Sequence, residues 1–277
     1  MRRIIFSDID GTLLNERYEL PCPPEELMRQ LGETEVVFVS SRTAAEILYL
    51  QSRLNFAADF IAENGAMIAT ANKKLAAHFE VTTQTEIDEH RRYVIPLAAP
   101  ASITLPQIKD LAAQHQADIE IFQEQSAAAV ASQSGYSSDD AARALHRRYS
   151  VLLMTRPSAR FYAALEAEGF TVAFGGKWTS IVKGSDKGRA VNIYLDARRD
   201  SGHEIFESIA IGNDANDAPM LEAAARKFII RNPVSGYSKA LEHIRNAERL
   251  TREGHHGWLD MLERLNARES LPFTLNT

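Results

Sequence analysis

Cysteine and long apolar runs are what this chain of 277 residues has least of. Its single cysteine, Cys22, cannot form a disulfide within the chain, so a disulfide-stapled secreted domain is excluded. The longest uninterrupted apolar stretches, such as residues 127–131, have about five residues, whereas a membrane-spanning helix needs roughly 20. We therefore expect no membrane partner.

An export signal and an excess of positive charge are also lacking. Only residues 4–6 are apolar between the N-terminal arginines and Ser7, whereas the core of a signal peptide has about 7 to 15 apolar residues. We therefore expect a cytoplasmic protein. The formal net charge of −6 argues against general nucleic-acid binding. The expected partner is a small molecule, bound by a monomer or a small homo-oligomer.

Both ends of the chain alternate short apolar strands with helices. The expected strands are residues 3–7, 35–40, 59–62, 206–211 and 227–231. Thr43 and Glu46 have the spacing of a capping box, which predicts a helix directly after the second strand. This alternation is typical of βαβ units. We therefore predict an α/β fold with a Rossmann-like parallel sheet that helices cover on both faces.

The middle of the chain is alanine-rich and predicts an inserted α+β domain. Expected helices lie near 105–115, 139–149 and 158–168, and expected strands near 118–122, 151–155, 170–174 and 179–182. Residues 126–135 are low in complexity and predict a loop. At roughly 150 residues per domain, the length also favours two units. We predict a core of residues 1–80 and 181–277 and an insertion of residues 81–180.

Two carboxylates stand where the first strand ends. Asp8 and Asp10 are two residues apart, and Gly11 follows them. At this spacing the side chains point to the same side of a strand, where two carboxylates repel unless a cation lies between them. Mg²⁺ meets that need, because it binds one or two carboxylates together with a substrate phosphate. The simpler alternative is an Asp-Gly turn with solvated acids.

A second polar group, GNDAND at residues 212–217, also follows an apolar strand. The carboxyl ends of parallel strands meet at one edge of a sheet, and ligands bind there. We therefore expect Asn213, Asp214 and Asp217 to lie near the first acidic pair. The simpler alternative is a polar loop that caps the next helix.

Two further motifs suit a bound phosphate. Ser40 ends a strand just before the helix that begins near Thr43, and hydroxyl and N–H groups at a helix N-terminus bind phosphate well. Lys187 falls in the first turn of another expected helix, where its charge opposes the helix dipole. That cost is tolerable if the ammonium faces an anion. Taken singly, each motif is also compatible with an ordinary cap or a solvated lysine.

In this order the four motifs resemble those of the haloacid dehalogenase superfamily of phosphatases. The match comprises DIDGT at 8–12, Ser40, Lys187 and GNDAND at 212–217. The long insertion resembles that of the Cof-like branch, and FGGKW at 174–178 is similar to mannosyl-3-phosphoglycerate phosphatases. The resemblance implies a phosphatase for a small phosphorylated sugar or related metabolite. It also implies that the insertion is a cap domain that selects the substrate.

The resemblance further implies a role for each residue of the reaction. Asp8 would attack phosphorus and form an aspartyl-phosphate, and Asp10 would act as general acid and then as general base. Ser40 and Lys187 would bind the phosphate. Asp217 would orient Lys187 or a metal-bound water.

Mg²⁺ is the implied cofactor, with Asp8, Asp10, Asn213 and Asp214 as its expected ligands. Relatives often have an aspartate where this chain has Asn213. An amide oxygen can still bind Mg²⁺, but one negative charge is lost. One alternative is therefore a catalytically weakened regulatory protein that binds a phosphorylated ligand. Another is a sugar phosphomutase, which uses the same aspartyl-phosphate.

Four residues in the insertion or just after it are candidates for substrate contacts, although each has a solvated or structural alternative. They are Arg160, Lys177, Trp178 and Lys183. The adjacent histidines at 255–256 have no further ligand at metal-binding spacing, so we predict a loop there.

Overall fold

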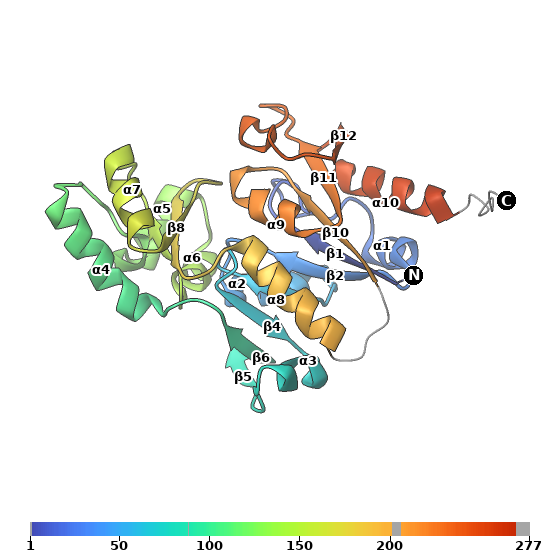
Figure 1. Ribbon diagram of the computed structural model, residues 1–277, viewed down its shortest axis with the longest axis horizontal. Coiled ribbons are helices and arrows are strands. Elements are labelled where there is room, and N and C mark those ends of the chain that lie inside the picture. The colour runs from blue at the N-terminus through green and yellow to red at the C-terminus, as the bar shows by residue number, and fades with distance from the viewer. Residues whose placement is uncertain (1, 88, 201–205, 270–277) are drawn as a thin grey trace.

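The protein, seen in a computed structural model, has a nine-stranded sheet within the described residues, 2–87, 89–200 and 206–269 (Figure 1). Its strand order is β12-β11-β10-β1-β2-β3-β4-β6-β5. The neighbours from β12 to β3 pair in parallel. Their bounds are β1 (Arg2–Ser7), β2 (Glu35–Val39), β3 (Asp59–Ala62), β10 (Phe206–Gly212), β11 (Arg226–Arg231) and β12 (Ala247–Glu253). The prediction of an α/β fold with a parallel sheet is confirmed.

Helices cover both faces of this sheet. One apolar cluster joins the sheet to α1 (Pro24–Leu31), α2 (Ala44–Leu54) and α10 (His255–Glu269). The other cluster joins it to α3 (Lys73–His78), α8 (Lys187–Asp200) and α9 (Ala218–Ala223). Among the described residues, none of the helices has both the length and the apolar character to cross a bilayer.

Three antiparallel strands extend the sheet beyond β3. They are β4 (Met67–Thr70), β6 (His90–Pro96) and β5 (Thr85–Ile87). The strands β5 and β6 fall inside the stretch 81–180 that we assigned to the insertion, yet they belong to the large sheet. We therefore propose that the inserted unit begins near residue 97 instead of 81 and ends near Lys183.

The inserted unit, here called the cap, lies beside the carboxyl edge of the sheet (Figure 1). A small antiparallel sheet has the order β7-β9-β8, and apolar residues of α4 and α7 pack against it. The bounds are β7 (Val151–Leu153), β8 (Phe170–Ala173), β9 (Thr179–Lys183), α4 (Ala101–Gln114) and α7 (Ala159–Ala167). Two further helices, α5 (Ala127–Ser134) and α6 (Ser138–Leu145), complete the cap.

Several local predictions were wrong. Residues 126–135 form α5 instead of a loop, because Ser126 caps the N-terminus, alanines favour the helix and Gly135 ends it in the left-handed region. Residues 118–122 form no strand: Ile121 makes one isolated bridge to β7 before the short helix η1 (Phe122–Glu124). The histidines at 255–256 begin α10 instead of lying in a loop.

Candidate active site

Three loops meet at the carboxyl edge because β10, β1 and β2 are neighbours. Ser7, the last residue of β1, pairs with Ile211 of β10 and with Phe38 of β2. The residues that follow these three strands therefore come together, namely Asp8 and Asp10, the segment 212–217, and Ser40. The beginning of α8 supplies Lys187 to the same place.

Lys187 joins two of these loops. Its ammonium donates to Asp8 Oδ1 at 2.8 Å and to Asp217 Oδ1 at 2.7 Å, and the residue is only 1% exposed. Burial lowers the pKa of Lys187, but the carboxylates of Asp217 and Asp8 outweigh it and raise the pKa overall, so the ammonium stays charged. Burial, and after it the carboxylate of Asp217, outweigh the opposing charge of Lys187 and together raise the pKa of Asp8 to about 7.

Both carboxylate oxygens of Asp217 accept hydrogen bonds from neighbouring residues of the site. It is completely buried, and its Oδ2 accepts hydrogen bonds from the backbone N–H groups of Asn213 and Asp214 at 2.9 and 3.1 Å. Gly212 permits this fold of the loop, because a Cβ there would lie 2.6 Å from the Asp217 side chain. Asp217 therefore holds both Lys187 and the loop that carries Asn213.

The carboxylate of Asp10 is bound by the guanidinium of Arg42. The guanidinium donates to both carboxylate oxygens, at 2.7 and 2.8 Å. Arg42 also donates to Glu46 at 3.3 Å, and Glu46 completes the capping box with Thr43 that begins α2. The Asp10 side chain is 45% exposed and lines the cavity, so it can reach a ligand there.

Oxygen atoms suited to a hard cation lie beside Asp8. Among the described residues, no three His, Cys, Asp or Glu side chains are grouped to hold a metal ion. However, the Asn213 amide lies 3.4 Å from the main-chain carbonyl oxygen of Asp10, and both residues line the cavity together with Asp8. Gly11 allows this approach, because a Cβ there would lie 2.5 Å from Asn213 Nδ2. Asp8 and Asp217 also bring two carboxylates to one ammonium, and a cation would balance the excess charge.

Of the two remaining predicted site residues, Asp214 lines the cavity and Ser40 does not. The Asp214 carboxylate lines the cavity and accepts hydrogen bonds from the backbone of Ala215 and from Ser238 Oγ. The Ser40 hydroxyl is buried and accepts from the Arg42 N–H at 3.2 Å.

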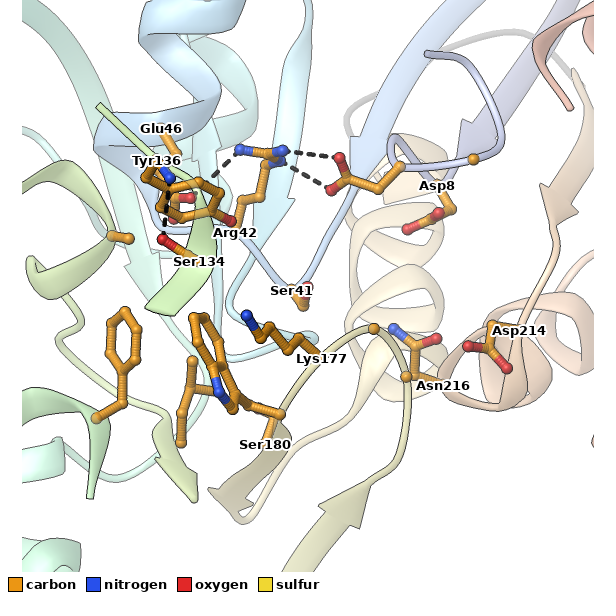
Figure 2. Close-up of a pocket in the computed structure, with 18 of the residues that line it drawn as sticks. Asp8, Ser41, Arg42, Glu46, Ser134, Tyr136, Lys177, Ser180, Asp214 and Asn216 are labelled. Atoms are coloured by element: carbon orange, nitrogen blue, oxygen red, sulfur yellow. Dashed lines mark hydrogen bonds and ion pairs between the residues drawn. The ribbon is translucent and has the colours of Figure 1, made fainter. Parts of the chain in front are cut away.

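The cavity between core and cap has a volume of about 440 Å³. Asp8, Asp214 and Asn216 lie on its core side, while Tyr136 and Lys177 approach from the cap (Figure 2). Of the four predicted cap contacts, Lys177 and Trp178 line this cavity. Arg160 and Lys183 do not, and the Lys183 ammonium donates instead to Gln107.

Several residues of the site escaped the sequence reasoning. Arg42 lies two residues after Ser40 but was given no role, and Glu46 was predicted only as part of a capping box. Tyr136 and Arg147 line the cavity from the cap, and no local signal marked them, because only the tertiary fold brings them to the sheet edge.

Comparison with known proteins identifies the family. The family model that describes haloacid dehalogenase-like hydrolases matches residues 5–247 of this chain. The chain belongs to this family. It is 27% identical over 268 residues to a glucosyl-3-phosphoglycerate/mannosyl-3-phosphoglycerate phosphatase of Methanococcoides burtonii, covering 93% of this chain and 95% of the relative. It is 29% identical over 232 residues to a mannosyl-3-phosphoglycerate phosphatase of Pyrococcus horikoshii, covering 83% and 91%. The prediction of a phosphatase of this family is confirmed.

Solved structures share the fold of this hydrolase. A phosphatase of the haloalkanoate enzyme superfamily from Bacteroides thetaiotaomicron has a TM-score of 0.65 at 16% identity, covering 96% of both chains. The sucrose-phosphatase of Synechocystis, solved with sucrose and phosphate, has a TM-score of 0.60 at 15% identity, covering 96% of this chain and 99% of its own. At these identities the likeness concerns the fold alone.

Proposed function

We propose that this hydrolase is a Mg²⁺-dependent phosphatase for a small phosphorylated sugar or related metabolite, of the mannosyl-3-phosphoglycerate type. The observation that carries the proposal is the buried bridge from Asp8 through Lys187 to Asp217, at the base of a cavity that Asp10 also lines. A nucleophile, a fixed positive charge and an acid–base group therefore lie in one place.

Asp8 is the proposed nucleophile. Lys187 occupies its Oδ1, and no hydrogen bond to its Oδ2 occurs within the described part of the chain, so Oδ2 is available to attack phosphorus. The P–O bond to the alcohol breaks as the aspartyl-phosphate forms, and Asp10 gives the leaving oxygen a proton. Asp10 then takes a proton from the water that hydrolyses the intermediate. Arg42 holds the Asp10 side chain at the cavity, and one of its two N–H groups must release a carboxylate oxygen when Asp10 carries the proton.

The residues beside Asp8 fit Mg²⁺. The Asp8 carboxylate, the Asp10 carbonyl and the Asn213 amide oxygen would hold it, with Asp214 close by, once the Asn213 amide is turned so that its oxygen replaces its nitrogen. When bound, the ion would neutralise charge on the phosphate and on Asp8. Lys187 would contribute a second positive charge through its contact with Asp8 Oδ1, and Ser40 stays the proposed hydroxyl for the phosphate.

The cap side of the cavity supports a sugar-like substrate. Trp178 and Phe122 form a tilted aromatic pair there, and Lys177 and Tyr136 add an ammonium and a hydroxyl. Apolar ring faces beside hydrogen-bonding groups suit a polyol that carries charge. The names of the two curated relatives support the same class of substrate.

The test is phosphate release from a panel of phosphate esters and one acyl phosphate, with Mg²⁺ and with a chelator. The panel contains mannosyl- and glucosyl-3-phosphoglycerate, simple sugar phosphates and acetyl phosphate. We expect Mg²⁺-dependent release, fastest with a glycosyl-3-phosphoglycerate. Release that is equal in Asp8→Asn, or an isomerised sugar phosphate in place of free phosphate, would contradict the proposal.

The amide at position 213 favours a second candidate function, that of a catalytically weakened regulatory protein. Asn213→Asp separates the two. If the protein is an enzyme as it stands, the aspartate tightens Mg²⁺ binding and changes kcat by no more than about tenfold. A rise of several hundredfold would show that the asparagine suppresses catalysis. Steady-state kinetics at saturating Mg²⁺ measure the difference.

A further inference from the structure

The loop between β2 and α2, residues 40–42, has three consecutive carbonyl groups, and each accepts a hydrogen bond. The first and third accept from the backbone N–H groups of Asn64 and Glu63, both at 2.9 Å. The middle one, of Ser41, accepts from Arg147 Nη1 at 2.9 Å. The core thus fixes the two outer carbonyls of the phosphate-binding loop, and the cap fixes the central one.

Arg147 is also connected to the acid–base group. Its guanidinium lies 3.9 Å from the carboxylate of Glu46, which accepts from Arg42, which in turn binds both oxygens of Asp10. The Arg147 side chain is only 5% exposed, so its charge is poorly screened. Displacement of the cap would remove a positive charge and a hydrogen bond from this chain of contacts.

Arg147 is held in place from within the cap as well. The same Nη1 donates to Ser150 Oγ at 3.0 Å, and that hydroxyl donates to the Glu63 carboxylate at 2.7 Å. The Glu63 carboxylate also accepts from the backbone N–H groups of residues 148–150. The position of the guanidinium therefore depends on how the cap segment 143–150 lies on the core.

We infer that Arg147 is a positioning residue for phosphoryl transfer. It fixes the phosphate-binding loop through Ser41 and the Arg42–Asp10 pair through Glu46, so both reach working geometry only when the cap is docked. This inference rests on the proposed function. Arg147 also lines the cavity, and a direct contact with the bulk of the substrate is the competing role.

Acetyl phosphate separates the two roles, because its two-carbon acyl group is too small to need the cap for binding. We compare Arg147→Gln, Arg147→Lys and the matched control Arg148→Gln. Arg148 is the exposed neighbour, and its contact with Glu63 uses only the backbone N–H, which the substitution keeps. Each variant is assayed with acetyl phosphate and with the best sugar phosphate, and inorganic phosphate is tested as a competitive inhibitor.

A positioning role predicts that Arg147→Gln lowers kcat for both substrates by a similar factor of at least about tenfold and weakens inhibition by phosphate. Arg147→Lys recovers part of the loss, since an ammonium can still donate to the Ser41 carbonyl, and Arg148→Gln stays within about twofold of the wild type. Thermal unfolding of each variant identifies any loss of fold. If Arg147→Gln unfolds, the kcat values of Arg147→Lys with the two substrates test the inference instead.

Unchanged acetyl phosphate turnover in Arg147→Gln, with a raised KM for the sugar phosphate alone, would overturn the inference and leave Arg147 as a substrate contact. That result would leave the proposed function intact. By contrast, a wild type that hydrolyses no phosphate ester would remove the proposed function itself.

Discussion

At the scale of single residues, the buried group of Asp8, Lys187 and Asp217 has two carboxylates for one ammonium. Asp8 and Asp217 share the one ammonium of Lys187, and the raised pKa of Asp8 reports the cost. An active site often keeps such an unfavourable arrangement because the substrate complex needs it. The imbalance predicts opposite effects on stability for two substitutions that should both abolish activity.

Asp8→Asn is the substitution expected to preserve or increase stability. It removes one of the two carboxylates and leaves a balanced Lys187–Asp217 pair, so the free energy of unfolding should stay equal or rise by about 1 kcal/mol. The nucleophile is lost, and kcat should fall by at least about 10³-fold. Urea unfolding in Mg²⁺-free buffer and phosphate release measure the two effects. A marked loss of stability would mean that Asp8 and Lys187 form a favourable pair by themselves.

Lys187→Met is expected to act in the other direction. The apolar side chain leaves the carboxylates of Asp8 and Asp217 facing each other without a buried cation, which should cost about 3–5 kcal/mol of stability. Activity should fall by about 10²–10³-fold or more, because positive charge near the phosphate is lost. The same unfolding experiment provides the comparison with Asp8→Asn. Equal stabilities for the two variants would contradict the charge imbalance.

At the scale of elements, the strands that end at the site could be predicted from the sequence, and the contacts between them could not. β1, β2 and β10 are short apolar runs followed by polar residues, so both the strand and the place of Asp8, Ser40 and Asn213 follow from a local pattern. The strands β5 and β6 have no such pattern. They form because antiparallel pairing with β4 and with each other satisfies their backbone groups, while only Ile87, Tyr93 and Ile95 are buried.

The cap was the least predictable part for the same reason. The prediction of a loop in place of α5 was wrong because an alanine-rich segment buries little apolar surface and shows only a weak helical repeat of apolar residues. Ser126 and Gly135 nevertheless mark the two ends of the helix. Arg147 and Glu63 come from segments more than 80 residues apart, and only the docked fold makes them part of one network. The motifs therefore revealed the chemistry, and the structure was needed to show what holds it in place.

A glycine at the junction of two elements allows a test at this scale. Gly65, in the turn after β3, has a φ of 95°, and a Cβ there would lie 2.0 Å from the carbonyl oxygen of Asp186, directly before Lys187. Gly65→Ala should therefore cost roughly 2 kcal/mol or more and move the start of α8, with at least about a tenfold loss of kcat.

Gly169 is the matched control for this substitution. It has a φ of 78°, but a Cβ there has no neighbour within 4 Å, so Gly169→Ala should cost only the backbone strain of about 1–2 kcal/mol and leave kcat unchanged. Thermal unfolding and phosphate release compare the pair. If both variants behave alike, the close approach to Asp186 has no role in positioning Lys187.

At the scale of the whole molecule, the backbone of the cap supplies several of the contacts that dock the cap on the core. Thr43 Oγ1 donates to the carbonyl of Arg143, and the Glu63 carboxylate accepts from three consecutive cap N–H groups. Glu63 is 1% exposed, and its own N–H holds the third carbonyl of the loop 40–42. Glu63 therefore binds the cap with its side chain and the loop 40–42 with its backbone.

Glu63→Gln tests whether the hydrogen bonds to the Glu63 carboxylate determine the position of the cap. The amide keeps one acceptor oxygen but turns an NH₂ group toward backbone N–H donors, and each lost bond to a charged acceptor is worth about 1.5–3 kcal/mol. We expect amide hydrogen exchange at residues 148–150 to become faster by about tenfold or more. Turnover of acetyl phosphate should fall as well, because Arg147 belongs to the same segment.

Glu86→Gln is the control for the loss of one carboxylate. Glu86 is exposed on β5 near the cap junction, and the substitution should leave both exchange and turnover unchanged. Hydrogen exchange resolved to residues 148–150 separates local undocking from global unfolding, since only the latter would also speed exchange in β1 and β10. Unaltered exchange at 148–150 in Glu63→Gln would contradict this prediction. It would mean that the other contacts, such as those of Thr43 and Arg147, keep the cap docked without the Glu63 carboxylate.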